Sequence, residues 1–204
     1  MAHVHVIEFQ KRGLPHCHLL IILRGEDKLR TRQDIDCLIS AEIPDPEEDL
    51  ELHNLVKSCM IHGPCGVQNA SCVCMEDGQC KKKFPKPFRD ETAENINGYP
   101  AYRRRNNGRT VQIGSLVADN SYVVPYNKQL LRKFRAHINV EACATVKSVK
   151  YLFKYVYKGH DCANMEMVVE DGEARDEIKT YLNCRYMCIN VRAHAIYTYV
   201  HGSG

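Results

Sequence analysis

The sequence predicts an α+β domain: a central antiparallel sheet with a His-x-His strand, flanked by helices, and a small Cys/His-rich knuckle. Two β-patterned runs, 4–10 and 16–23, flank a turn near Gly13 and predict a hairpin. Apolar residues at helical spacing follow downstream, and cysteines concentrate between residues 59 and 80. The 204 residues suffice for one domain, so residues 1–204 are interpreted as a single domain containing a knuckle and basic extension over 59–90.

The composition narrows the class of protein. Hydrophobic residues make up 44% of the chain and charged residues 26%, which is typical of a soluble globular domain. No apolar run approaches the ~20 residues of a membrane-spanning helix, and the first eight residues do not resemble a signal peptide. Eleven cysteines without a secretory signal favour metal ligation or free thiols over a disulfide framework.

The remaining elements are predicted in chain order from periodicity and capping residues. Thr31 is a candidate helix cap, Asn106-Asn107-Gly108 a candidate hairpin turn, and Gly159 a helix stop. Helices are expected over 32–39, 47–60, 127–134, 146–157 and 173–188, and short strands over 101–105, 110–113, 122–124 and 137–142. The chain begins within a strand and ends without a clear stop, so we expect a fragment of a longer protein.

The second strand of the predicted hairpin carries His16 and His18. Alternate residues of a strand share one face, so both imidazoles point the same way. With the turn near Gly13, Glu8 and Gln10 are expected opposite His18 and His16. Two imidazoles and one side-chain oxygen form a plausible three-ligand metal site, and such a metal acts as a Lewis acid on a phosphoryl oxygen.

The alternative is that this His-x-His pair binds no metal, because such pairs are common on strands. Glu8 on the apolar face favours the metal, since a bare carboxylate there needs a partner. His3 and His5 form a similar pair on the opposite face from Glu8. They lack an obvious third ligand and are interpreted as surface residues.

Tyr151 and Tyr155 are four residues apart on the predicted helix, so their hydroxyls project from one face. Lys150, Lys154 and Lys158 form a neighbouring row. A tyrosine hydroxyl can act as a nucleophile, and nearby cations lower its ordinary pKa of about 10 and can hold a phosphate. The alternative is an amphipathic helix on which the tyrosines only pack.

Six cysteine and histidine residues fall between positions 59 and 80. One imidazole and three thiolates suit tetrahedral structural zinc. The four candidate ligands are His62, Cys65, Cys74 and Cys80. Cys59 and Cys72 are spare candidates, and the alternative is a loop of reduced thiols.

Basic residues gather in the segments 81–109 and 128–158, which hold 17 of the 28 lysines and arginines. This segregation creates a local positive field that suits a polyanion, and interleaved tyrosines could stack on bases. A solvated basic face is the alternative. The candidate DNA-binding residues are Lys81, Lys82, Lys83, Lys86, Arg103, Arg104 and Arg105.

Several blocks of the chain resemble, in the same order, the HUH endonuclease (Rep) domain of Helitron transposases, a family of rolling-circle replication initiators. The match runs from about residue 4 to about residue 186. The blocks are 8–20 (EFQKRGLPHCHLL), 61–66 (IHGPCG), 80–86 (CKKKFPK), 124–127 (VPYN), 137–141 (HINVE) and 150–159 (KYLFKYVYKG).

The resemblance implies a metal-dependent enzyme that nicks single-stranded DNA, becomes joined to the 5′ phosphate through tyrosine and can rejoin strands. It implies Mg²⁺ or Mn²⁺ held by His16 and His18 with Glu8, or else Gln10, as third ligand. Tyr151 and Tyr155 would then be the nucleophiles, and Lys154 and Lys158 would steady the phosphate.

Helitron proteins also carry a helicase domain, whereas no Walker A pattern occurs here. We therefore expect either an isolated nuclease segment, whose helicase lies elsewhere in the full-length protein, or a decayed remnant. The substrate makes a nucleus the expected compartment in a eukaryote. Two other functions stay open: a non-catalytic nucleic-acid-binding zinc module, and a metallohydrolase in which the His pair activates water.

Overall fold

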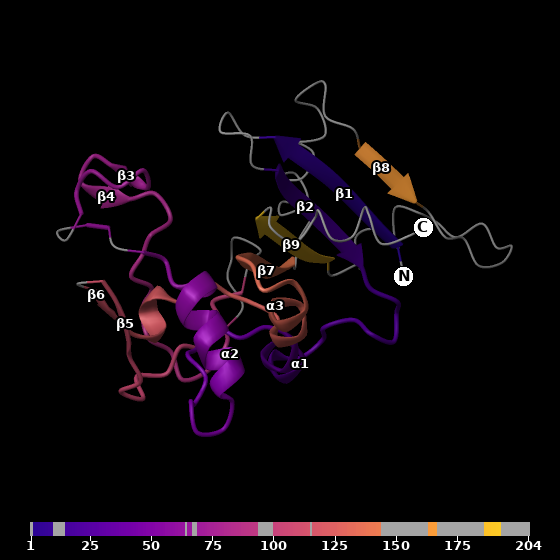
Figure 1. Ribbon diagram of the computed structural model, residues 1–204. Helices are drawn as coiled ribbons and strands as arrows, with labels where there is room; N and C mark the ends of the chain where they lie inside the picture. The colour runs from indigo at the N-terminus through magenta and orange to yellow at the C-terminus, as the bar shows by residue number, and fades with distance from the viewer. Residues whose placement is uncertain are drawn as a thin grey trace, which may run out of the picture.

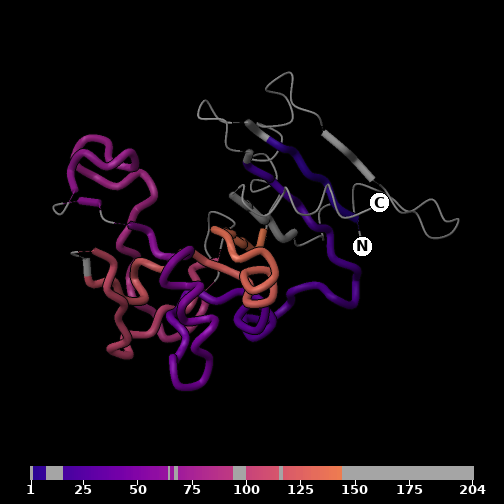
Figure 2. The backbone as a smooth tube through the Cα atoms, in the orientation of Figure 1, coloured from indigo at the N-terminus to yellow at the C-terminus, as the bar shows by residue number. Residues whose placement is uncertain are grey.

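The computed structural model describes residues 2–9, 15–63, 65–66, 69–93, 100–114, 116–143, 163–166 and 186–192 (Figure 1). The predicted helix over 146–157 lies outside this part of the chain. Figure 2 follows the path of the backbone in the same view. None of the helices in the described ranges is long and apolar enough to cross a bilayer.

A five-stranded antiparallel sheet has the order β7-β9-β2-β1-β8. Its strands are β1 (Ala2–Phe9), β2 (Pro15–Ile22), β7 (Ile138–Cys143), β8 (Ala163–Glu166) and β9 (Tyr186–Arg192). Strand β2 is the middle strand and carries His16 and His18. This confirms the predicted hairpin and the central sheet with a His-x-His strand.

Strand β9 corrects the end of the helix predicted over 173–188, because Tyr186, Met187 and Cys188 belong to the sheet; residues 173–185 lie outside the described part of the chain. The strand fills the space between β2 and β7, with Leu19 opposite Ile189 and Ile189 opposite Val140. Pairing on both sides satisfies its main-chain groups, so tertiary context decides the conformation here.

Two predicted helices begin at side chains that cap them, and Thr31 is the cap that the sequence predicted. Helix α1 (Arg32–Leu38) starts with a capping box, in which the Thr31 hydroxyl accepts the Asp34 N–H and the Asp34 carboxylate accepts the Thr31 N–H. Helix α3 (Lys128–Phe134) starts at Asn127, whose side chain accepts the Leu130 N–H at 2.9 Å. Both predictions are confirmed.

The helix predicted over 47–60 consists of two parts. Helix α2 (Leu50–Leu55) continues as one π-helical turn, η1 (Val56–Met60). Asp49 caps α2 by accepting the Leu52 N–H at 3.1 Å. The π-turn ends directly before Ile61, so it sets the direction in which the chain enters the Cys/His-rich knuckle.

One face of the sheet packs on a hydrophobic core with α1 and α3. Alternate residues of β7 belong to this core, and alternate residues of β2 pack against it. They are Ile138, Val140 and Ala142 on β7, and Cys17, Leu19 and Ile21 on β2. The period of two along a strand therefore places His16 and His18 on the other face of the sheet.

A second core lies under α2 and η1 and includes Leu52, Met60 and Leu131. In Figure 1 the helices lie between the large sheet and the knuckle, which are at opposite ends of the described structure. The two predicted metal sites are therefore well separated.

The segment 101–118 differs from its prediction. No strand forms over 101–105; instead β5 (Val111–Ile113) pairs with β6 (Leu116–Ala118), with Gly114 in the turn at φ 57°. Residues 101 and 104 make only isolated bridges, to Ala93 and Arg89. The predicted hairpin at Asn106-Asn107-Gly108 is wrong because the side chain of Arg104 anchors this segment in the interior.

Arg104 is 4% exposed, and its guanidinium donates to the main-chain carbonyls of Ala41, Asn120 and Val123. Burial lowers the pKa of this group to about 10, against the opposing effect of Glu141. Arg104 therefore joins three separate segments, and the prediction that it contacts DNA is wrong.

We expect Arg104→Met to lower the free energy of unfolding by about 3 kcal/mol, because buried carbonyls would lose their donor. Chemical denaturation would measure this loss. The matched control is Arg24→Met, since Arg24 makes only an exposed pair with Glu26 at 3.9 Å, and its expected effect is below about 1 kcal/mol. Equal effects of the two changes would contradict the anchoring role.

Candidate metal centre and the His-bearing sheet face

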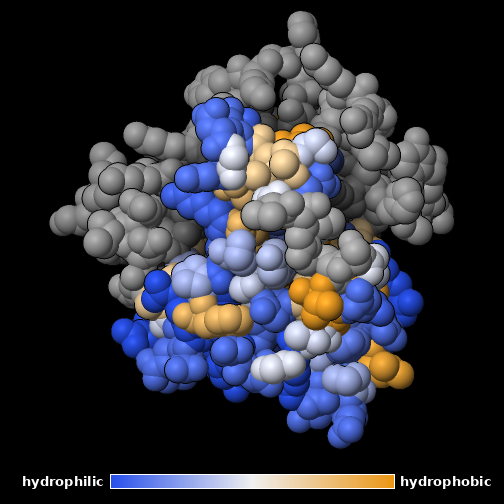
Figure 3. Space-filling model, turned by 90° about the vertical axis from the view of Figure 1, so that its left-hand side faces the viewer, coloured by the Kyte–Doolittle hydropathy of each residue, from blue (hydrophilic) through white to orange (hydrophobic). Residues whose placement is uncertain are grey.

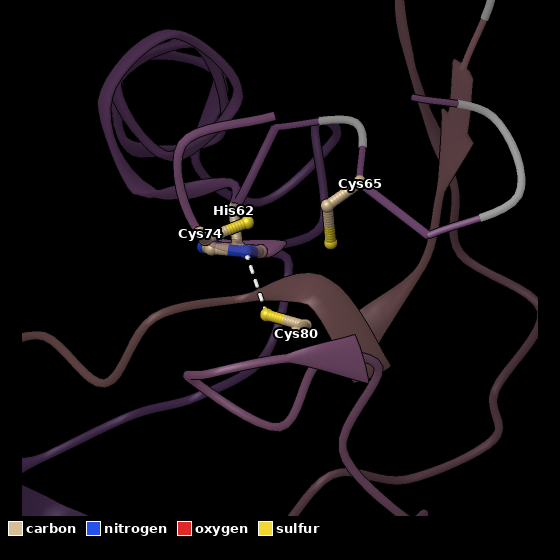
Figure 4. Close-up of side chains that lie close together, drawn as sticks. All are labelled: His62, Cys65, Cys74 and Cys80. Carbon is tan, nitrogen blue, oxygen red and sulfur yellow. Dashed lines mark hydrogen bonds between the residues drawn. The ribbon is translucent and has the colours of Figure 1, made fainter. Parts of the chain in front are cut away.

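The knuckle brings together the four residues that its sequence predicted as ligands. One ligand atom each from His62, Cys65, Cys74 and Cys80 lies within 4.8 Å of the other three (Figure 4). His62 Nε2 and Cys80 Sγ are 3.4 Å apart. The cluster can hold a metal ion, which confirms the predicted grouping.

A short hairpin explains why two of these thiols meet. Strand β3 (Met75–Glu76) pairs with β4 (Gln79–Cys80) around Asp77-Gly78, whose φ angles of 50° and 75° are those of a two-residue hairpin turn. The Lys81 N–H closes the hairpin by donating to the Cys74 carbonyl at 2.7 Å. Cys74 and Cys80 are thereby held at its two ends.

His62 is positioned from two sides. Its main-chain N–H donates to the Tyr122 carbonyl at 2.9 Å, directly after η1. Its ring stacks on that of Phe84, with centroids 4.2 Å apart and planes at 13°. These contacts fix the imidazole beside Cys80 without consuming the nitrogen that faces the thiol.

The electrostatics of the cluster fit a cation. Burial raises the pKa of Cys80, but the main-chain N–H groups of Phe84 and Lys82 outweigh it, so the pKa falls below its usual value. Burial and the neighbouring thiols raise the pKa of Cys74 to about 12, and burial also raises the pKa of Cys65. Packed thiols resist becoming thiolates together, and a bound cation removes that resistance.

The two spare cysteines differ in position. Cys72 Sγ lies 3.5 Å from Cys74 Sγ, next to the cluster. Cys59 instead hydrogen-bonds through Sγ to the Arg135 carbonyl at 3.9 Å. Neither belongs to the group of four, and His62, Cys65, Cys74 and Cys80 together offer one imidazole and three thiols, a donor set of the kind found in structural zinc sites.

The second candidate centre is the His-bearing face of the sheet. Glu8 lies opposite His16 in register, and Val6 lies opposite His18. The predicted register placed Glu8 opposite His18, so it was wrong by two residues. A shift of two leaves every residue on its face, and position 8 therefore stays on the face of both histidines. Gln10 lies outside the described residues.

This face is shielded from solvent around His18, which is 6% exposed. Val6 and Leu20, also on this face, are 0% and 5% exposed. Neither belongs to the two cores described above. His18 therefore sits in a low-dielectric environment, where a bound cation would act on a phosphate more strongly than in water.

The neighbouring strands extend this face with polar positions that the sequence did not single out. Arg192 of β9 stands opposite His16, and Asn190 stands opposite His18. Asn139 of β7 stands opposite Asn190. No local pattern could identify these positions, because only the pairing of β2, β9 and β7 aligns them.

Glu141, two residues beyond Asn139, lies at the edge of the same face. Burial raises the pKa of Glu141 to about 7, against the opposing effects of the Tyr102 hydroxyl, Arg104 and Lys86. Tyr102 also accepts the Ala142 N–H at 2.7 Å. The side chains around Glu141 thus tie the outer edge of β7 to the segment that follows the knuckle.

His3 and His5 lie on the opposite face of β1 from position 8, as predicted. Their rings stack on each other with centroids 5.9 Å apart. The predicted nucleophiles and phosphate-binding lysines lie outside the described residues, and their roles stay predictions. They are Tyr151, Lys154, Tyr155 and Lys158.

The predicted DNA-binding arginines are occupied within the fold. Beside the buried Arg104, Arg105 forms a close ion pair with Glu42 at 2.6 Å, and Arg103 lies 3.6 Å from the same carboxylate. The ion pairs of Arg103 and Arg105 attach both side chains to the loop at Glu42, so a ligand would have to compete with Glu42 for them. Lys81, Lys82 and Lys83 remain exposed, whereas Lys86 is half-buried.

A comparison with models of known protein families finds no match for this chain, and a search of curated proteins finds no similar sequence.

Proposed function

We propose that this chain is a metal-dependent endonuclease that nicks and rejoins single-stranded DNA through a tyrosine, as in the HUH domains that it resembles. The observation that carries the proposal is the register of β1 and β2. It sets Glu8 opposite His16, on the face that also bears His18, in the middle of the sheet. A carboxylate and two imidazoles offered from two adjacent strands suit a divalent cation with open positions.

In this proposal the three metal ligands have a distinct role in cleavage. His16, His18 and Glu8 would hold Mg²⁺ or Mn²⁺, which when bound supplies charge neutralisation at the scissile phosphate. The strand pairing fixes the three main-chain positions before substrate arrives, so little reorganisation is needed. The low exposure of His18 limits the access of water, which favours transfer to a protein nucleophile over hydrolysis.

The nucleophile in this proposal is the phenol oxygen of Tyr151 or Tyr155. It loses its proton and bonds to phosphorus, while the bond from phosphorus to the 3′ oxygen breaks. The leaving 3′ oxygen takes up a proton, and the 5′ phosphate stays esterified to tyrosine. The reverse reaction, with an incoming 3′ hydroxyl, rejoins strands. Lys154 and Lys158 steady the phosphate.

We further propose that the metal in the cluster of His62, Cys65, Cys74 and Cys80 is zinc and that its role is structural. All four ligand positions are filled by protein, which leaves no open position for a substrate. The second candidate function is therefore a zinc module that binds nucleic acid without cutting it. The exposed lysines that follow Cys80 favour this alternative.

One assay separates these functions. Zinc-loaded protein is incubated with end-labelled single-stranded DNA and Mn²⁺, and the products are resolved on denaturing gels. The proposal predicts a covalent protein–DNA adduct, sensitive to protease, that Tyr151→Phe or Tyr155→Phe reduces and the double change abolishes. Tyr157→Phe, on the same segment, is the matched control and should leave the adduct intact.

Other outcomes of the same assay would contradict the proposal. Cleavage without an adduct would indicate that the His pair activates water. DNA that is retarded in native gels but stays intact would indicate the non-catalytic zinc module.

A further inference from the structure

A basic segment, residues 82–89, leaves the metal centre along the surface and is called the strip below. Its outward side chains include Lys82, Lys83, Phe88 and Arg89, all of which are exposed. Phe88 is 41% exposed, which is unusual for a large aromatic ring. The strip thus combines cations with an aromatic surface, the two features with which proteins hold single strands.

The strip is fixed at the metal centre at its beginning. The main-chain N–H groups of Lys82 and Phe84 point to Cys80 Sγ, and the Lys83 N–H donates to the Cys80 carbonyl at 2.7 Å. Lys83 adopts a left-handed conformation with φ 56°, which turns the chain out of the hairpin. The position of the first two lysines therefore depends on a metal ligand.

Two more anchors hold the rest of the strip on the fold. The Lys86 N–H donates to the Ser121 carbonyl at 2.9 Å. Arg89 and Arg104 exchange two main-chain hydrogen bonds, each of 2.9 Å. Because the Arg104 side chain is buried and bonds to three main-chain carbonyls, this end of the strip is attached to the interior of the fold.

The inward side of the strip packs on a ligand of the metal centre. Phe84 stacks on His62, and the Lys86 ammonium lies 5.0 Å from the centre of the Phe84 ring. Lys86 also donates to the Lys82 carbonyl at 2.7 Å. Phe84 and Lys86 thus hold the strip in shape and leave its other side to a partner.

Lys82 and Lys83 differ in their pairing from several arginines of the fold. The arginines on the neighbouring surface pair with acids: Arg103 and Arg105 with Glu42, Arg109 with Asp45, Arg132 with Asp49, and Arg135 with Glu51. Lys81 pairs with Glu76 at 2.9 Å. None of the described acids forms an ion pair with Lys82 or Lys83. Figure 3 shows this side of the molecule, whose coloured surface is mainly hydrophilic with small apolar patches.

We propose that the strip 82–89 binds single-stranded DNA and that the metal centre controls its affinity. Lys82, Lys83 and Arg89 contact phosphates, and Phe88 stacks on a base. This inference rests on the proposed function only for its choice of DNA as the partner.

The test is the affinity of the zinc-loaded full chain for labelled oligo-dT, measured by fluorescence anisotropy without added Mg²⁺ or Mn²⁺. Changing Lys82 and Lys83 together to alanine should weaken binding about tenfold and reduce the salt dependence by about two ions. Phe88→Ala should weaken binding about tenfold with an unchanged salt dependence. The control changes Lys57 and Lys128, exposed lysines of η1 and α3, to alanine and should alter affinity less than about twofold.

A second pair of variants tests whether the affinity for oligo-dT depends on the metal centre. Cys80→Ser should lower the affinity as much as the lysine changes do, whereas Cys37→Ser, at an exposed free thiol, should not. The proposal would be overturned if the lysine variants bound oligo-dT as tightly as the control variant does. It would also be overturned if unlabelled poly-glutamate competed for binding as well as unlabelled oligo-dT. Failure of the nicking proposal would give a different result: the protein would bind oligo-dT normally but form no covalent adduct.

Discussion

Replacing His16 or His18 by alanine should reduce single-stranded DNA cleavage by about a thousandfold. The two imidazoles lie on one face of the central strand, and position 8 stands opposite His16. Removing either would leave a cation with too few ligands to stay bound at the scissile phosphate. The loss should appear in the rate of adduct formation at saturating DNA, with little change in oligo-dT affinity.

His3 and His5 supply a matched control for this result. They are also two histidines two residues apart, but they lie on the opposite face of β1. Changing both to alanine should leave the rate within about twofold of the parent. Equal losses in both pairs would mean that the changes act through the stability of the sheet. An unchanged rate in the His16 variant would remove the pair from the mechanism.

Removing one thiol of the metal centre should have the second large effect. We expect elemental analysis to find zinc in the parent protein, and Cys74→Ser and Cys80→Ser should each lose it. Structural zinc sites contribute about 10–16 kcal/mol of binding free energy, so the β3–β4 hairpin should lose its order when the metal leaves. Hydrogen exchange at the amides of Lys82 and Phe84, which point to Cys80 Sγ, should then rise sharply.

Cys37→Ser is the control for this change, because Cys37 is an exposed free thiol on α1. It should keep both the zinc and the slow exchange. Parent protein that contains no zinc after expression in zinc-supplemented medium would refute the zinc assignment. Full zinc content in the Cys74 variant would refute the ligand set.

Local signals in the sequence predicted the parts of the structure that depend on few neighbours. Thr31 identified the start of α1, because a cap needs only main-chain groups within three residues. The cluster of His62, Cys65, Cys74 and Cys80 could be predicted because these residues fall within one short segment. Alternation along β2 was enough to place both histidines on one face.

Features that depend on distant pairing could not be predicted. The register of β1 and β2 depends on the length and type of the connecting turn, which the alternation of side chains along a strand does not determine. The register predicted for Glu8 was therefore wrong by two residues. Strand β9 was mistaken for the end of a helix because its order comes from the strands on both sides. The burial of Arg104 beside exposed Arg105 could not be predicted either. Charge alone does not show which of two neighbouring arginines donates hydrogen bonds to buried main-chain carbonyls.

The most direct test of the central claim is the nitrogen environment of Mn²⁺ bound to zinc-loaded protein, measured by pulsed electron paramagnetic resonance. We predict couplings from imidazole nitrogens that His16→Ala and His18→Ala each reduce and the double change removes, while His3→Ala and His5→Ala leave them intact. Mn²⁺ without nitrogen couplings, or couplings that survive the loss of both His16 and His18, would contradict a catalytic cation on this face of the sheet.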